Sequence, residues 1–197
     1  RSGDIQNVQS FDEFYAVFQE ELYKDLHEAD EIGKGLQSIR SRDCNLVSNM
    51  FLDGCIQNAK SVTQGGTDTY VAVGLLIGIS NVIDSLAVTK QLVFDEKRIT
   101  MKQLIEALQN NWNGYGELRE YILKKGMFFG NDDDLSNGMA HRFFESLYKW
   151  NTGDNYLHKK LVFGNLVGYN EHHKFFGDHT KATPDGRFDG DMLNFGI

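Results

Sequence analysis

The sequence predicts a helix-rich α/β fold, and three features of its 197 residues support this class. Apolar residues recur at helical spacing through most of the chain. Two short stretches near 69–73 and 161–167 are rich in the β-branched and aromatic residues that favour strands. Glycine pairs and a single proline mark the breaks between elements. Because 41% of the residues are hydrophobic and 24% are charged, we expect a folded globular piece.

The first predicted element is a helix over 10–30. Ser10 can cap it, and Glu13 lies three residues further on, which is the capping-box spacing. Phenylalanines follow at helical spacing. We expect Gly33 and Gly35 to end this helix.

A second helical run, a strand and two more helices should follow. The run is expected to end at the glycine pair 65–66, shortly before the strand near 69–73. Apolar spacing then predicts a helix over 79–94. Thr100 can cap the next helix, since Gln103 occupies the capping-box position.

The last third of the chain begins helical and then changes character. Helices are predicted over 117–125 and from the polar run at 131–134 to Trp150, which carries an apolar stripe. After the strand-like stretch near 161–167, the chain is expected to finish in loops. The only proline lies in the sequence Thr-Pro-Asp-Gly-Arg at 183–187, which is typical of a tight turn.

Charge and hydropathy exclude two kinds of partner. The formal net charge is −8, and no Lys/Arg cluster provides the positive face that nucleic acid or acidic lipid requires. Glycines at 74 and 78 break the apolar stretch 71–79, which is far shorter than the roughly 20 residues of a membrane helix. With two cysteines and no signal-peptide pattern, we expect a cytoplasmic protein that contacts neither nucleic acid nor membrane.

The C-terminal histidines are a weak metal-site pattern. His172, His173 and His179 lie near Glu171 and Asp178, which could together ligate a divalent ion. No histidine pair has the i, i+4 spacing of a helical zinc site, and no cysteine accompanies them. We therefore expect no metal site and no cofactor bound by this chain.

Two other local patterns point to structure rather than chemistry. Cys55 is expected to pack as a small apolar residue, because Leu52 and Ile56 lie at helical spacing from it. The acidic run 131–134 lacks the glutamate that closes a calcium loop, since position 142 is Arg, and it is expected to start a helix. We expect no catalytic residue in this chain.

Read in order, several segments resemble the glycyl radical enzymes. The segments are the cysteine at 55 with the double glycine 65–66, the helix 78–96, Phe-Gly-Asn-Asp at 129–132 and Thr-Pro-Asp-Gly-Arg at 183–187. The chain is most similar to the group that includes B12-independent glycerol dehydratase and pyruvate formate-lyase-like enzymes. It departs from the pattern at Met127, Phe128 and Asn137, which leaves the subfamily open.

The resemblance implies a fold and a place within it. Members have a ten-stranded α/β barrel made of two five-stranded halves, and residues 1–197 resemble a single fragment of the second half, a helix-rich partial barrel. The family's catalytic Gly-Cys-x-Glu loop and its radical Arg-Val-x-Gly-Tyr loop are both absent from these residues. The isolated chain is therefore expected to be inactive.

The resemblance also implies candidate substrate-binding residues. The strand before the Thr-Pro-Asp-Gly-Arg turn supplies a side chain that faces the substrate in glycerol dehydratase-like members. Tyr169 is the nearest match, and a one-residue gap in the alignment would give that place to Asn170 or His172 instead. Tyr169 could equally fill the barrel wall.

Partners and alternatives follow from the same resemblance. The intact relative carries a glycyl radical that an iron–sulfur activating enzyme installs with S-adenosylmethionine, and the resulting thiyl radical drives lyase or dehydratase chemistry. This chain would need the remainder of the barrel, or separate chains that carry the cysteine and glycine loops. The alternatives are a short non-catalytic paralogue and a split-enzyme subunit, each acting by protein binding.

Overall fold

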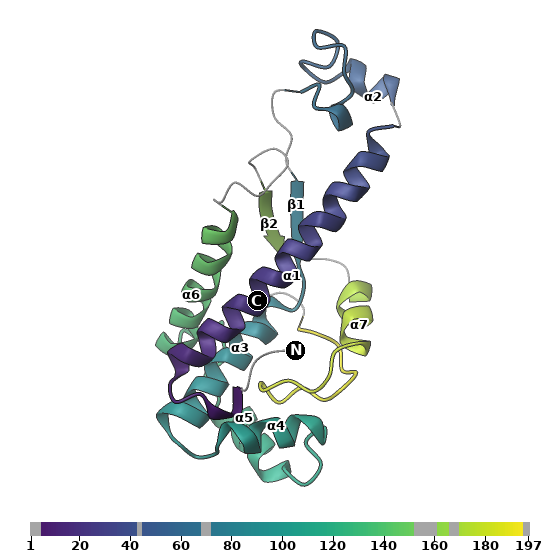
Figure 1. The fold of residues 1–197 in the computed structure, drawn as a ribbon. Coiled ribbons are helices and arrows are strands. Elements are labelled where there is room, and N and C mark those ends of the chain that lie inside the picture. Colours follow the sequence, from purple (N-terminus) through teal and green to yellow (C-terminus); the bar gives the residue numbers. More distant parts are fainter. Residues whose placement is uncertain (1–4, 43–44, 68–71, 152–160, 166–169, 195–197) are drawn as a thin grey trace. The chain divides into compact units, whose positions relative to one another are not determined.

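The structure is a computed structural model that describes residues 5–42, 45–67, 72–151, 161–165 and 170–194. These residues are mostly helical and include two short strands (Figure 1). The predicted helix-rich α/β composition is therefore found in this part of the chain. None of its helices is both long and apolar enough to span a bilayer.

The chain divides into two compact units. Unit 1 comprises Arg1–Phe18, Leu75–Leu147 and Gly164–Ile197, and unit 2 comprises Gln19–Gly74 and Tyr148–Phe163. Each unit is described by itself below. That the whole chain is one fragment of a larger barrel stays a prediction.

Helix α1 (Phe11–Arg40) is longer than expected. Its start is confirmed, because the backbone N–H of Glu13 donates to Ser10 Oγ at 3.2 Å. The prediction that Gly33 and Gly35 end the helix is wrong, since both lie inside it. Glycine costs a helix only about 1 kcal/mol relative to alanine, and the other residues of a long helix overcome that cost.

The next segment of unit 2 is made of turns. Helix α2 (Leu46–Met50) is short, so the prediction of a helical run as far as the glycine pair is wrong. A 3₁₀ turn, Val62–Gln64, precedes Gly65, which has a φ of 79° in the left-handed region. The N–H of Gly66 then donates to Ser61 O at 2.8 Å.

Most of the remaining elements agree with the sequence pattern until the C-terminal part. In chain order they are β1 (Ala72–Leu76), α3 (Ile79–Thr89), α4 (Met101–Gln109), α5 (Gly116–Lys125), α6 (Asp134–Asn151), β2 (Leu161–Asn165) and α7 (Asn170–Asp178). The strand predicted over 69–73 is found only at 72–73 and continues through Gly74, whereas residues 69–71 lie outside the described part of the chain. The two strands form one sheet. Helix α3 continues into a π-helical turn, so the predicted helix over 79–94 is confirmed.

Helix caps account for two of the helix starts. The N–H of Gln103 donates to Thr100 Oγ1 at 3.2 Å, and the Thr100 N–H donates to the Gln103 side chain at 2.9 Å, which is the predicted capping box of α4. At the start of α6, the N–H of Ser136 donates to Asp133 Oδ1 at 2.9 Å. The acidic run therefore starts a helix, as predicted.

Helix α7 is a correction to the expected loops. Its sequence is Asn-Glu-His-His-Lys-Phe-Phe-Gly-Asp. Only a few of its residues are buried, and they are not apolar residues at helical spacing, so the sequence pattern does not predict a helix. His173 and Gly177 are buried four residues apart, and they place one face of α7 against the C-terminal segment. The predicted strand residues 166–167 lie outside the described part of the chain.

The hydrophobic core of unit 1 joins α3, α4 and α5. Its buried members are Val88, Leu92, Met101, Leu104, Ala107, Trp112, Ile122 and Ala182. Ala182 comes from the C-terminal segment, so the core also anchors the Thr-Pro-Asp-Gly-Arg turn. This packing gives the turn a rigid base.

Candidate functional site

The Thr183–Arg187 segment forms the tight turn that the sequence predicts. The N–H of Gly186 donates to Thr183 O at 3.0 Å, and the N–H of Thr183 donates to Arg187 O at 3.2 Å. Gly186 has a φ of 93°, a conformation that side chains disfavour. Asp185 Oδ1 accepts a 2.5 Å hydrogen bond from Thr183 Oγ1, which closes the turn from inside.

Arg187 is buried and binds the backbone around the turn. Its guanidinium donates to Thr180 O at 2.8 Å, to Asp191 O at 2.5 Å and to Lys181 O. Its Nε donates to Thr183 Oγ1 at 3.2 Å. Four of the five N–H groups of this guanidinium thus donate to oxygens of the chain itself, which makes Arg187 a structural brace.

The turn is also fixed to the core of unit 1. Trp112 Nε1 donates to Arg187 O at 3.1 Å, and Arg119 Nε donates to Gly186 O at 2.7 Å. The Arg119 guanidinium lies 3.9 Å from the ring centroid of Phe188. The geometry of this turn therefore depends on residues far from it in the sequence.

Asn81 connects α3 to this turn and to the segment that follows it. Its Nδ2 donates to Asp185 Oδ2 at 2.6 Å, and its Oδ1 accepts from the Asn194 N–H at 2.7 Å. Asn81 and Asp185 are both buried. Since the side-chain polar atoms of both residues already have partners within the chain, the pair holds the two segments together and leaves no atom of its own for a substrate.

Asp84 is a second buried carboxyl on the same helix. Its Oδ1 accepts a 2.7 Å hydrogen bond from the Phe129 N–H, which ties α3 to the Phe-Gly-Asn-Asp segment. Burial raises the pKa of Asp84 to about 6, although the hydrogen bond from Phe129 acts in the opposite direction and the charge of Asp185 adds to the rise. Asp84 is thus the one described carboxyl whose pKa is clearly raised by burial, although it is still mostly ionised at pH 7.

This pKa predicts how stability changes with pH. The folded chain holds the Asp84 proton up to about pH 6, whereas the unfolded chain releases it near pH 4, so the contribution of this group to stability falls as pH rises from about 4 to about 6. We expect Asp84→Asn to raise the free energy of unfolding by about 1–2 kcal/mol at pH 7 and by nearly nothing at pH 4. Urea denaturation at a series of pH values measures this difference. The exposed substitution Glu117→Gln serves as the control, and a pH-independent effect of Asp84→Asn would contradict the assignment.

A cavity of about 370 Å³ lies beside the turn, within unit 1. We call it the α3 cavity. Its walls come from the first part of α1, from α3 and from the C-terminal segment, and they are formed by Phe14, Phe18, Ile77, Gly78, Asn81, Val82, Ser85, Leu86, Thr89, Thr180, Thr183, Pro184 and Leu193. No charged side chain is among these lining residues. The cavity thus suits an uncharged, largely apolar occupant.

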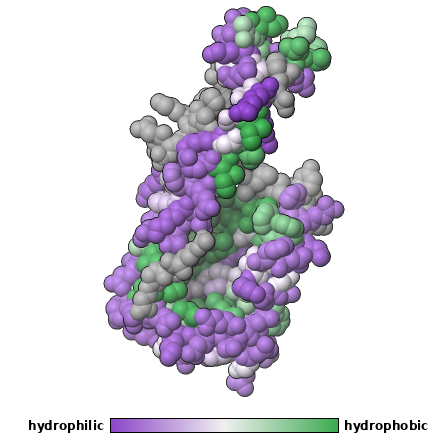
Figure 2. All heavy atoms as spheres, turned by 45° about the vertical axis from the view of Figure 1, so that its right-hand side comes forward, coloured by the Kyte–Doolittle hydropathy of each residue, from purple (hydrophilic) through white to green (hydrophobic). Residues whose placement is uncertain are grey.

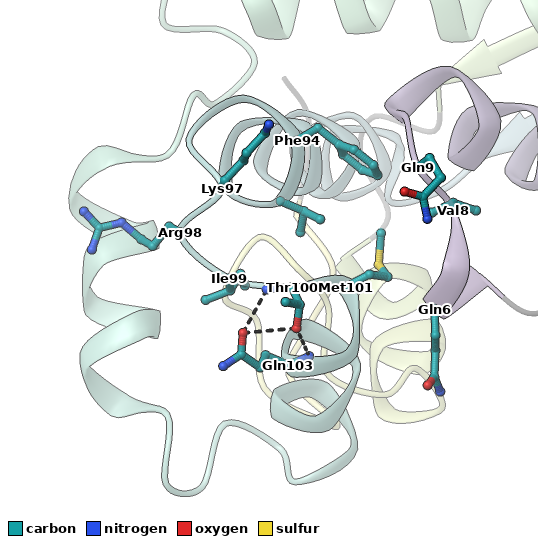
Figure 3. A pocket seen from close by; sticks show the side chains of 11 residues that line it. Gln6, Val8, Gln9, Phe94, Lys97, Arg98, Ile99, Thr100, Met101 and Gln103 are labelled. Atoms are coloured by element: carbon teal, nitrogen blue, oxygen red, sulfur yellow. Dashed lines mark hydrogen bonds between the residues drawn. The ribbon is translucent and has the colours of Figure 1, made fainter.

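A larger cavity of about 530 Å³ lies where the N-terminal segment meets the start of α4. Figure 3 shows that the Arg98 guanidinium points away from the other lining side chains, and it lies 3.7 Å from the ring centroid of Tyr121. Thr100 and Gln103 hydrogen-bond to each other in the capping box. The arrangement brings together no nucleophile and base, so it is not a catalytic set.

Of the predicted substrate-binding residues, only His172 and the alternative Asn170 are among the described residues. Tyr169 lies outside the described residues. His172 lies on α7 and is exposed, whereas its neighbour His173 is 1% exposed and its backbone O accepts from the Leu193 N–H at 3.2 Å. No sequence pattern indicates this difference in exposure, because it depends on which face of the unexpected helix α7 is buried.

Among the described residues, neither the two histidines of α7 nor His179, which follows the helix, belongs to a group that could hold a metal ion. His179 Nδ1 lies 2.7 Å from Phe175 O, within hydrogen-bonding distance of the backbone. A different group, His27, Asp30 and Glu31 on α1, has its ligand atoms within 4.8 Å of one another. Lys34 already occupies that group, with its Nζ 2.7 Å from both carboxylates, and these contacts raise the pKa of Lys34 to about 12.

Cys55 is buried, as expected for a packed thiol. The segment around it turns instead of forming the expected helix, and Ile56 is 66% exposed. The predicted helical packing of Cys55 with Ile56 is therefore wrong, although the burial of Cys55 is confirmed.

Known proteins are similar to this chain along its whole length. A family described as "Pyruvate formate lyase-like" matches residues 1–161. Trans-4-hydroxy-L-proline dehydratase of Clostridioides difficile is 28% identical over 202 residues, which cover 100% of this chain and 25% of the relative. Isethionate sulfite-lyase of Desulfovibrio desulfuricans is 26% identical, covering 99% of this chain and 24% of the relative.

Solved structures agree with the sequence matches. The substrate-bound hydroxyproline dehydratase of Clostridioides difficile superposes with a TM-score of 0.91 at 27% identity, over 98% of this chain and 25% of that one. The glycerol-bound B12-independent glycerol dehydratase of Clostridium butyricum superposes with a TM-score of 0.88 at 25% identity, over 99% of this chain and 25% of that one. The chain therefore spans about a quarter of the length of these relatives.

Proposed function

Because this chain belongs to the pyruvate formate lyase-like family of glycyl radical enzymes, we propose that it is the scaffold quarter of a glycyl radical lyase or dehydratase. The observation that carries the proposal is the match of the entire chain to one quarter of hydroxyproline dehydratase, in sequence and in structure. The proposed fold is the matching part of the second half-barrel. By itself the chain is proposed to be inactive.

The described residues support a scaffold role. Arg187, Asn81 and Asp185 all direct their polar atoms at this chain's own backbone and side chains. In the proposed intact enzyme, the glycyl radical would supply the hydrogen abstraction that starts the reaction, after installation by an activating enzyme. The residues of this chain would hold the barrel wall in place around that reaction.

The proposed substrate is a small hydroxylated molecule. Three of the matched relatives are named for trans-4-hydroxy-L-proline, glycerol and isethionate, and each of these compounds carries a hydroxyl group. We propose that Tyr169 or His172 faces this substrate in the intact enzyme. The exposed position of His172 on α7 is compatible with such a contact.

Substitutions in the full-length enzyme test this assignment. We expect His172→Ala or Tyr169→Phe to lower kcat/KM by about 10- to 100-fold through loss of a substrate hydrogen bond, without changing Tm. Steady-state kinetics of both variants measure the effect. His179→Ala is the matched control, and unchanged kcat/KM in both test variants would remove these residues from the site.

The proposed partner is the remainder of the barrel, in the same polypeptide or in separate chains. Unit 2 presents many exposed apolar side chains, which Figure 2 shows gathered over α2 and its neighbourhood. These side chains are Ile32, Leu36, Ile39, Leu46, Val47, Met50, Phe51 and Ile56. An apolar surface of this extent is typical of a buried interface, and it also favours the split-subunit alternative over a free-standing monomer.

The reading frame around these residues tests the proposed function. We expect a Gly-Cys-x-Glu motif upstream and an Arg-Val-x-Gly-Tyr motif downstream. If the two motifs are instead encoded by separate neighbouring genes, the protein is a subunit of a split enzyme. Their absence from the genome near this sequence would contradict the proposal and leave a non-catalytic binding protein.

A further inference from the structure

The residues His27, Asp30 and Glu31 on α1 offer the donor atoms of a transition-metal site, and we call them the α1 triad. One imidazole nitrogen and two carboxylate oxygens all lie within 4.8 Å of one another. Residues three and four positions apart share one face of a helix, so this spacing brings the three side chains together. The common helical zinc pattern has two histidines four residues apart, whereas the triad has one histidine, so the sequence spacing alone does not indicate a metal site.

The Asp30 carboxylate of the triad is buried and only partly compensated. Its side chain is 0% exposed, and its Oδ2 lies 2.7 Å from Lys34 Nζ. Its Oδ1 is also buried and has no hydrogen-bond partner among the residues that the structure describes. Burying a carboxylate is unfavourable unless its oxygens are paired. Asp30 can therefore accept a further contact from a cation.

Lys34 shows that the triad attracts a cation. Its Nζ lies 2.7 Å from a carboxylate oxygen of Asp30 and from one of Glu31, and these contacts raise the pKa of Lys34 to about 12. The hydrogen bond and the charge of Lys34 lower the pKa of Glu31, and the charge of His27 lowers it further. Since the Lys34 side chain is 34% exposed, its ammonium group can turn into solvent when another cation binds.

The donor set selects a metal ion of the zinc type. Mg²⁺ and Ca²⁺ take oxygen ligands, whereas imidazole together with carboxylates suits Zn²⁺. Tetrahedral ligands of Zn²⁺ lie about 3.3 Å apart, so donor atoms within 4.8 Å of one another need to approach by at most about 1.5 Å. His27 and Glu31 are exposed, and rotation of their side chains can supply this movement while the buried Asp30 stays in place.

We propose that the α1 triad binds a divalent transition-metal ion such as Zn²⁺, which displaces the Lys34 ammonium group from the two carboxylates. Water completes the coordination, because the triad supplies three ligands. The site stabilises unit 2, since the three ligands come together only when α1 is helical, and an ion that binds the folded state alone shifts the folding equilibrium. This inference goes beyond the proposed function and does not depend on it.

The zinc affinity of two histidine variants of the full-length polypeptide tests the triad. Metal is first removed with a chelator, and Zn²⁺ binding is then measured by isothermal titration calorimetry. We expect His27→Ala to weaken binding at this site by about 100-fold, since even the partners of a metal ligand contribute about 10- to 100-fold. His141→Ala on α6 is the matched control, because His141 is also an exposed helical histidine, and it should leave the affinity unchanged. Zinc sites elsewhere contribute equally to both variants, so the difference between them isolates the triad.

Replacing Lys34 by methionine distinguishes a metal site from a permanent ion pair. The substitution removes the competing ammonium group, so we expect Zn²⁺ to bind about 10-fold more tightly than in the unsubstituted polypeptide. In the presence of a chelator, Lys34→Met should lower the Tm, because the buried Asp30 carboxylate loses its ion pair. Added Zn²⁺ should restore the Tm of Lys34→Met, and it should not do so when His27→Ala is also present.

Two results overturn the proposal. Equal Zn²⁺ affinity in His27→Ala and in the unsubstituted polypeptide shows that the triad is not a metal site. Because His27 is exposed, this comparison holds even if Lys34→Met does not fold. A Lys34→Met variant that binds Zn²⁺ no more tightly, or whose Tm Zn²⁺ does not restore, shows that Lys34 is a permanent partner of Asp30.

Discussion

Replacing Arg187 by methionine is expected to lower the free energy of unfolding by about 3–4 kcal/mol. The buried guanidinium donates to Thr180 O, Lys181 O, Asp191 O and Thr183 Oγ1, and methionine satisfies none of these acceptors. The loss would also loosen the turn that Trp112 contacts through Arg187 O. Urea denaturation followed by tryptophan fluorescence measures the change.

Two further variants distinguish loss of the Arg187 hydrogen bonds from loss of its positive charge. Arg187→Lys is expected to lose most of the same stability, because an ammonium group cannot span the acceptors that the planar guanidinium reaches. Arg98→Met removes an exposed arginine that stacks on Tyr121, and it should cost less than about 1 kcal/mol. If Arg187→Met costs no more than Arg98→Met, the turn is not braced as the structure indicates.

Gly66→Ala is expected to destabilise unit 2 by about 2–4 kcal/mol. A Cβ atom at Gly66 would overlap the backbone carbonyl of Lys60 and lie 2.9 Å from Ser61 O, and backbone atoms cannot move aside as a flexible side chain can. Asn58 Nδ2 also donates to Gly66 O at 2.8 Å, so any shift would break a second contact. The double glycine is thus needed because two stretches of backbone meet there.

The rate at which the buried thiol of Cys55 is labelled measures the destabilisation of unit 2, since Cys55 lies in the same unit as Gly66. With Cys44 replaced by serine in every sample, we expect Gly66→Ala to accelerate thiol labelling of Cys55 by about 100-fold through easier local opening. Gly138→Ala is the matched control, because a Cβ there meets nothing within 4 Å, and it should stabilise α6 by about 0.5–1 kcal/mol. Similar labelling rates in the two variants would contradict the close approach at Gly66.

Local patterns in the sequence predict much of the fold, because helix caps and tight turns are determined by residues close together in the chain. The caps at Ser10 and Thr100 and the tight turn at 183–187 depend on neighbouring residues, and all three are present in the structure. The end of α1 is not predictable from Gly33 and Gly35, because glycine only weakens a helix and does not stop it. Helix α7 was missed because only part of one face is buried.

The site was less predictable, because its contacts join distant parts of the chain. The hydrogen bond from Asn81 to Asp185 spans 104 residues, and no spacing rule in the sequence identifies such a pair. Arg187 was expected only as part of a turn, yet its side chain carries the network around it. Sequence similarity identified the family, whereas the roles of these side chains required coordinates.

Electron paramagnetic resonance of the full-length polypeptide tests the central claim most directly. The polypeptide encoded by the reading frame that contains these 197 residues would be incubated without oxygen, together with an S-adenosylmethionine-dependent activating enzyme and a reductant. We predict the signal of a carbon-centred glycyl radical, which disappears when the glycine of the Arg-Val-x-Gly-Tyr loop is replaced by alanine. A folded full-length polypeptide that never develops this signal with its activating enzyme would contradict the assignment of this chain to a glycyl radical lyase or dehydratase.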